Sequence, residues 1–149
     1  MRISPPTLQS LSTRVGHEDH AAFRRLYELL APATLAGIRE HLPDPVQSMH
    51  VLRGTFCEIW WMCAFDARCR TPQCDVPRWV DAVAAQRRVE RVRMLDLIAA
   101  EPPHSRSTSV LAGLMDDLDM WTQFQLAATL DGQDAIDVGV SRHDASGHV

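Results

Sequence analysis

The segment MHVLRGTFCEIWWMC, residues 49–63, has the clearest helical pattern in the sequence. Its large apolar residues recur at intervals of three, four and seven, which is the spacing of one face of an α-helix. We therefore predict a long helix here, with a buried face made of Met49, Leu52, Phe56, Ile59, Trp60 and Cys63. The preceding LPDP, residues 42–45, predicts a turn with Pro45 in the first turn of that helix.

The flanking segments have the same period. The apolar residues between Phe23 and Leu42 predict a helix pair that is divided at Pro32. After the long helix, Phe65–Pro77 contains two prolines and no periodicity, and therefore predicts a loop, with Asp75 placed to cap the following helix. That helix is expected from Pro77 to about Ile98.

The C-terminal part is expected to contribute only short helices. EPPHSRSTS, residues 101–109, is typical of a linker, and one or two short helices are expected up to about Leu130. No strand pattern or repeat is present, so the predicted fold is all-α, a compact helical bundle with short C-terminal helices. The predicted organisation is a domain over residues 1–100, a linker over 101–109 and an acidic tail over 110–149.

Composition and charge limit the classes of protein to which this chain can belong. In 149 residues, 46% are hydrophobic and no apolar run reaches the roughly 20 residues that a membrane span requires. The opening MRISPPTLQS lacks the apolar core of a secretory signal, so we expect a soluble cytoplasmic protein with no membrane partner.

Charge is distributed unevenly along the chain. Residues 1–93 contain thirteen arginines and ten acidic residues, whereas residues 94–149 contain two arginines and nine acidic residues. The basic part suits a polyanion, and the acidic part suits a protein surface.

Catalysis is not indicated. The four cysteines have the spacing C-x5-C-x5-C-x4-C, which lacks the close pairs of structural zinc sites. No nucleotide-binding, metalloprotease or nucleophile-elbow motif occurs. We therefore expect no enzyme activity, no cofactor and no metal site. The positions of Cys57 and Cys63 indicate small apolar residues in or near the core, and a metal or redox role for Cys63, Cys69 and Cys74 is the lesser alternative.

An arginine row marks the last long helix. Arg87, Arg88 and Arg91 are predicted to project outward, opposite a face containing Trp79 and Val83, with Arg78 nearby. A solvated helix face and a phosphate-binding surface both explain such a row.

The order of these features resembles region two of the extracytoplasmic-function sigma factors of bacterial RNA polymerase, over residues 11–93. The matching positions are Ala21–Tyr27, Asp44–Pro45, Thr55–Phe56, Trp60, Phe65–Asp66, Trp79, Glu90 and Arg93. The resemblance implies a compact helical domain whose second long helix docks on the polymerase and whose last helix, with the loop before it, contacts promoter DNA. By position, the DNA-binding residues would be Arg78, Arg87, Arg88 and Arg91.

Two departures alter that expectation. The family's acidic docking stretch, E-D-x-x-Q-D, is replaced by Met49–Gly54, which makes Met49, His50, Arg53 and Gly54 a candidate partner-docking face of changed charge. Residues 110–142 resemble the start of region four, in a truncated form, and we do not expect this tail to read the −35 element.

Together these observations predict an atypical sigma-factor-like transcription regulator that binds RNA polymerase core or another regulatory protein, with promoter DNA as a further candidate partner. The alternative is a protein-interaction module, a sigma-like adaptor or decoy that binds a regulatory protein or itself without binding DNA.

Overall fold

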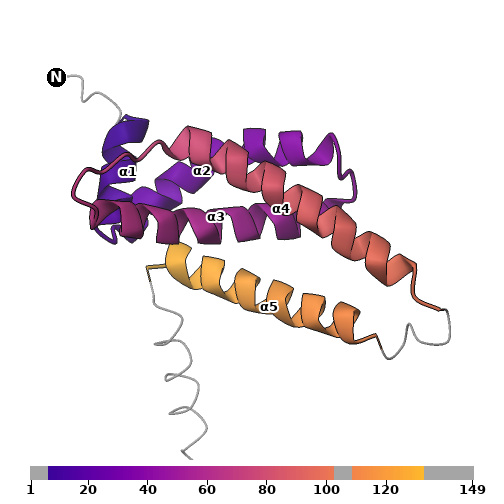
Figure 1. Cartoon of the computed structure of the whole chain (residues 1–149). Coiled ribbons are helices and arrows are strands. Elements are labelled where there is room, and N and C mark those ends of the chain that lie inside the picture. Colours follow the sequence, from indigo (N-terminus) through magenta and orange to yellow (C-terminus); the bar gives the residue numbers. More distant parts are fainter. Residues whose placement is uncertain (1–6, 103–108, 133–149) are drawn as a thin grey trace, which may run out of the picture.

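The computed structural model describes residues 7–102 and 109–132, and these residues form five helices without a β-strand (Figure 1). The all-α prediction is therefore confirmed. The helices are α1 (Leu8–Gly16), α2 (His20–Arg39), α3 (Pro45–Ala67), α4 (Val76–Ala99) and α5 (Val110–Leu130). None of them is both long and apolar enough to cross a membrane.

The residue just before each helix has a side chain that accepts a hydrogen bond from a backbone amide of the first turn. These N-cap residues are Thr7, Asp19, Asp44, Asp75 and Ser109. Such caps satisfy amide groups that have no partner within the helix. The predicted cap at Asp75 is confirmed, since its carboxylate accepts a hydrogen bond from the Arg78 amide.

Three boundaries differ from the predictions. Helix α2 is one continuous helix with Pro32 inside it, so the predicted helix pair is wrong. Buried Ala31 and Ile38 bring both halves of α2 into the same core, and this packing offsets the backbone hydrogen bond that proline removes. The predicted loop is also shorter, because α3 continues through Phe65 to Ala67. Finally, the segment after residue 109 forms one long helix rather than one or two short ones.

Helix α3 is the centre of the bundle. Five residues of its predicted stripe are buried, and the sixth, Met49, is half-buried against the core. Aromatic rings hold α2 on α3: the Phe23 ring lies 5.2 Å from Trp60 and the Tyr27 ring 4.9 Å from Phe56, both edge to face. Helix α1, which no pattern above predicted, adds Leu11 and Val15 to this core.

Helix α5 lies along α3 (Figure 1). Its C-terminal end is joined to the bundle, because Leu126 is part of the core and Thr129 O lies 2.8 Å from His20 Nδ1. Its N-terminal end extends toward the C-terminal part of α4, which runs away from the rest of the bundle (Figure 1). The candidate functional site lies between these two segments and α3.

Candidate functional site

The arginine row does not lie where the sequence placed it. Val80, Ala84, Arg87 and Arg91 are separated by four, three and four residues and therefore share one face of α4. Val80 and Ala84 are buried, so Arg87 and Arg91 continue the core-facing stripe instead of opposing it. The predicted outward orientation is wrong for Arg91 and only partly right for Arg87, which is half-buried.

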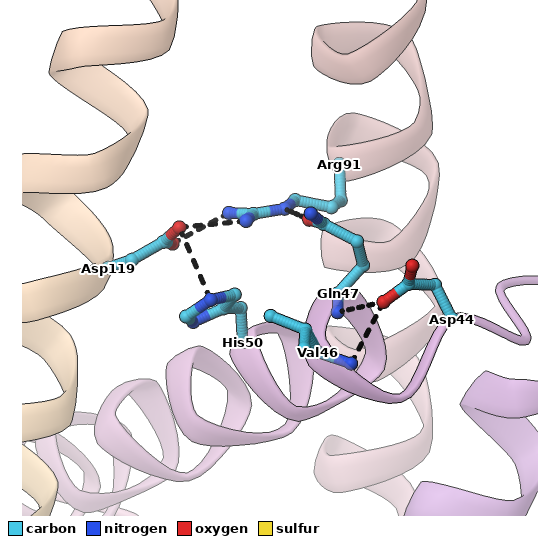
Figure 2. Close-up of polar contacts among 6 residues, drawn as sticks. All are labelled: Asp44, Val46, Gln47, His50, Arg91 and Asp119. Atoms are coloured by element: carbon cyan, nitrogen blue, oxygen red, sulfur yellow. Dashed lines mark hydrogen bonds and ion pairs between the residues drawn. The ribbon is translucent and has the colours of Figure 1, made fainter.

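Arg91 is held by side chains from two other helices. Its Nη1 and Nη2 donate hydrogen bonds of 2.6 and 2.7 Å to the two carboxylate oxygens of Asp119 on α5, and its Nε donates one of 2.7 Å to Gln47 Oε1 on α3 (Figure 2). The side chains of Arg91 and Asp119 are only 11% and 15% exposed. This is a bidentate, largely desolvated ion pair, the strong form of the interaction. It joins α3, α4 and α5 at one point.

His50 contacts the same carboxylate. Its Nε2 lies 3.7 Å from Asp119 Oδ2, whereas its Nδ1 is buried without a hydrogen-bond partner among the described residues (Figure 2). Burial lowers the pKa of His50; the Asp119 carboxylate opposes that shift, and the guanidinium groups of Arg91 and Arg53 add to it. The lowered pKa favours the neutral form of the imidazole, so the main charges of the polar cluster are those of Arg91 and Asp119.

The Arg87 side chain lies against Gly54 of α3. Its Nε donates a 2.8 Å hydrogen bond to Glu58 Oε2, and a Cβ atom on Gly54 would come within 2.9 Å of Arg87 Nη1. Both partners of this ion pair are about two-fifths exposed, so its contribution to stability is small. The glycine at position 54 gives the guanidinium room to lie flat against α3.

The candidate docking face is divided between two sides of α3. His50 and Gly54 face α4 and α5, as their contacts with Asp119 and Arg87 show. Met49 instead packs beside Tyr27 and Leu52, in a cleft of about 360 Å³ between α2 and α3. Arg53 is half-buried and near enough to His50 to affect its pKa. The structure thus joins half of the predicted docking face to half of the predicted arginine row.

A groove opens beside this cluster. It has a volume of about 450 Å³ and lies between α3, the C-terminal half of α4 and the N-terminal half of α5. We call it the α5 groove. Charged and polar groups of His50, Arg87, Arg91 and Asp119 form part of its lining, and the remainder is mainly apolar: Met94, Leu111, Leu114, Met115, Leu118 and Trp121.

An exposed apolar stripe on α5, which the sequence alone does not reveal, continues from the wall of the α5 groove, where Leu114, Leu118 and Trp121 lie. Val110, Leu114, Leu118 and Trp121 follow one another at intervals of four, four and three and are 74%, 55%, 63% and 56% exposed. The same periodicity is typical of a helix face packed on a core, which is why the sequence alone does not reveal the exposure. Consecutive exposed leucines with a tryptophan are characteristic of surfaces that bind other proteins.

The other two predicted DNA-binding residues remain accessible. Arg78 is exposed, and Arg88 is half-buried at a shallow cleft of about 210 Å³ that is also lined by Thr34, Gly37 and His41. Within the part of the chain that the structure describes, neither side chain forms an ion pair. Among the described residues, the four arginines therefore divide into two that form ion pairs and two that do not.

The described residues contain no group of three or more histidine, cysteine, aspartate or glutamate side chains placed to hold a metal ion. Cys57, Cys63, Cys69 and Cys74 are free thiols.

No protein-family model, no curated protein and no solved structure matches this chain, so its function has to be argued from the sites themselves.

Proposed function

We propose that this chain is a sigma-factor-like transcription regulator that acts by binding a protein partner in the α5 groove. One observation carries the proposal: α5 presents four large apolar side chains, each more than half exposed, beside a groove that already contains charged groups. The link to transcription is supported by the resemblance of residues 11–93 to sigma region two.

The shape and charge of the groove favour one kind of occupant. Between Val110 and Trp121, α5 extends about 18 Å, which is the length of three to four turns of a partner helix. Between Val110 and Leu130, α5 contains three aspartates and no basic residue, and Glu90 of α4 also lines the groove. We therefore propose an amphipathic helix whose apolar face covers Leu114, Leu118 and Trp121 and whose flanks are basic.

The same geometry weakens the case for DNA binding at Arg91. Its guanidinium already donates to Asp119 and Gln47, so a phosphate would have to displace a bidentate carboxylate. Helix α5 thus masks part of the surface that the resemblance assigns to DNA. This favours protein binding over nucleic-acid binding in the conformation described.

Co-purification with paired variants tests the proposal. The full-length chain carrying Leu114→Glu and Leu118→Glu should lose the protein that the wild-type chain retains from its native host, because two carboxylates enter the apolar contact. Leu29→Glu is the matched control, since Leu29 is an exposed leucine on α2, at 44%. Recovery of polymerase subunits or of one stoichiometric regulator that the double variant loses and the control keeps would support the proposal. A partner that both variants retain, or no partner, would reject it.

Promoter DNA is the second candidate, favoured by the two unpaired arginines. If DNA binds at Arg78 and Arg88, replacing both by alanine should lower affinity for a forked promoter fragment and reduce the salt slope by about two. Arg24→Ala with Arg25→Ala removes the same charge from exposed positions on α2 and is the control. Equal losses in the two double variants would show only a general charge effect and would exclude a site at Arg78 and Arg88.

A further inference from the structure

Two thiols meet at the opposite end of α3 from the Arg91 cluster. Cys63 lies near the end of α3 and is 1% exposed, and Cys74 immediately precedes Asp75, the N-cap of α4. Their sulfur atoms are 4.0 Å apart. A disulfide bond has a length of about 2.05 Å, so an approach of about 2 Å separates this contact from a covalent bond.

The segment between the two cysteines is already folded back on α3. Asp66 Oδ1 accepts a 2.8 Å hydrogen bond from the Gln73 amide, and this contact fixes the residue next to Cys74. This hydrogen bond holds the segment before Cys74 against the end of α3, where Cys63 lies. Such positioning favours an intramolecular bond over reaction with a second molecule.

The pair is reachable from the surface. A hollow of about 360 Å³ is lined by both cysteines, by Asp66 and Gln73, and by the exposed residue Thr13 of α1. Cys74 is half-buried, whereas Cys63 lies deeper. A small oxidant can thus contact Cys74 first.

The surroundings of the two thiols also differ in how they affect the thiol pKa values. Burial raises the pKa of both thiols, and it raises that of Cys63 furthest. For Cys74 the hydrogen bond with Cys63 opposes this effect, whereas the carboxylates of Asp66 and Asp75 add to it, so that the pKa of Cys74 stays above its ordinary value. Cys74 is the more exposed of the two thiols and meets the oxidant first, and Cys63, whose sulfur is 4.0 Å away, is placed to attack it second.

We propose that Cys63 and Cys74 form a reversible dithiol–disulfide pair that is oxidised by hydrogen peroxide. The Cys74 thiolate attacks one peroxide oxygen; an S–O bond forms, the O–O bond breaks, and the departing hydroxide takes up a proton to become water. Cys63 sulfur then attacks the sulfur of the Cys74 sulfenic acid, so that the S–S bond forms and the S–O bond breaks. The second hydroxide leaves with the Cys63 proton as water. Two thiols are oxidised, and one peroxide is reduced to two molecules of water.

The bond would tie the last turns of α3 to the first residue before the α4 cap. The segment from Cys69 to Gln73, which now depends on the Asp66 hydrogen bond, would become part of a closed covalent ring. The start of α4, where Arg78 lies, would thereby be fixed relative to α3. This inference does not depend on the proposed partner or on DNA binding.

Peptide mapping tests the pairing directly. Trypsin cuts the chain after Arg53, Arg68, Arg70 and Arg78, so Cys63 lies in peptide 54–68, Cys69 in 69–70 and Cys74 in 71–78. The reduced full-length chain is treated with graded peroxide, its free thiols are alkylated, and it is digested without reductant. We expect peptide 54–68 joined to 71–78, with fragmentation placing the link at Cys63 rather than Cys57.

Variants and a second measurement complete the test. Cys74→Ser should abolish the joined peptide, Cys69→Ser should leave its yield unchanged, and dithiothreitol should release it. The oxidised wild-type chain should melt several degrees higher than the reduced chain, and Cys74→Ser should show no such difference. A link between 69–70 and 71–78, or irreversible oxidation of Cys74 while Cys63 stays a thiol, would overturn the proposal.

Discussion

The two ends of α5 have the same kind of residues but different surroundings. At the C-terminal end, Leu126 is 4% exposed and part of the core; at the N-terminal end, Leu118 is 63% exposed and lies on the rim of a groove. The first end is held by apolar packing and by the contact between His20 and Thr129, whereas the strongest contact of the second is the polar cluster around Arg91 and Asp119. A helix attached in this way has one end that stabilises the fold and one end that is available for binding.

Truncating one leucine at each end of α5 should change the free energy of unfolding by very different amounts. Leu126→Ala should reduce the free energy of unfolding by about 2–4 kcal/mol, because it leaves a cavity in the core. Leu118→Ala should change it by less than about 0.5 kcal/mol, because that side chain is mostly in water already. Urea denaturation of the two variants measures both values. Similar losses in the two would show that the N-terminal half of α5 is packed as firmly as the C-terminal half.

Removing the carboxylate of the cluster should have the next largest effect. Asp119→Ala leaves the Arg91 guanidinium desolvated without its main partner, and we expect a loss of about 2 kcal/mol. Arg91→Ala with Asp119→Ala removes both charges and should be less destabilising than the sum of the single changes. Hydrogen exchange should accelerate in residues 110–122 of the Asp119→Ala variant. Unchanged exchange there would mean that the cluster does not hold this half of α5.

The pH dependence tests the histidine of the cluster. Because its folded pKa lies below the ordinary value of 6.5, the unfolded chain binds a proton that the folded chain does not as the pH falls below about 6.5. His50 therefore lowers stability from that pH down to its folded pKa, with a slope of at most about 1.4 kcal/mol per pH unit.

The comparison variant is His50→Gln, measured by urea denaturation at several values between pH 5 and pH 8. Its stability should fall less steeply than that of the wild-type chain over this interval. Identical slopes would exclude His50 as the titrating group.

The smallest effect concerns the wall of the α5 groove. Gly54→Ala should be nearly neutral, because the gain of about 0.5–1 kcal/mol from alanine in a helix is offset by displacement of the Arg87 side chain. In an Arg87→Ala background the same change should stabilise by that full amount. A thermal unfolding series on the four chains checks this, and a destabilising Gly54→Ala in the Arg87→Ala background would contradict the assigned contact.

The helices and the main core could be predicted from the sequence because their signals are local or strongly periodic. The stripe from Leu52 to Cys63 has apolar residues on one face only, and the Asp75 cap precedes its helix directly. The buried face of α4 is harder to predict from the sequence, because only valine and alanine residues mark it. Trp79 and Val89 suggested a different face, and the arginines were placed opposite it.

The site could not be predicted because it depends on partners distant in the chain. Arg91 meets an aspartate 28 residues away, and no periodicity of α4 contains that information. The exposure of Leu114 and Leu118 likewise follows from the direction of α5 relative to α4, which only the tertiary structure defines. Helical spacing groups the arginines and the resemblance indicates the docking residues, and the structure separates both sets by contacts that neither signal includes.

Amide hydrogen exchange of the chain, with and without the protein that co-purifies with it, shows whether the partner binds in the α5 groove. If the α5 groove is the binding site, protection should increase in residues 110–122 and in the facing part of α4, residues 87–97, while exchange around Arg78 stays the same. Protection confined to residues 76–88, with none in α5, would contradict the claim and place the contact on the unpaired arginines.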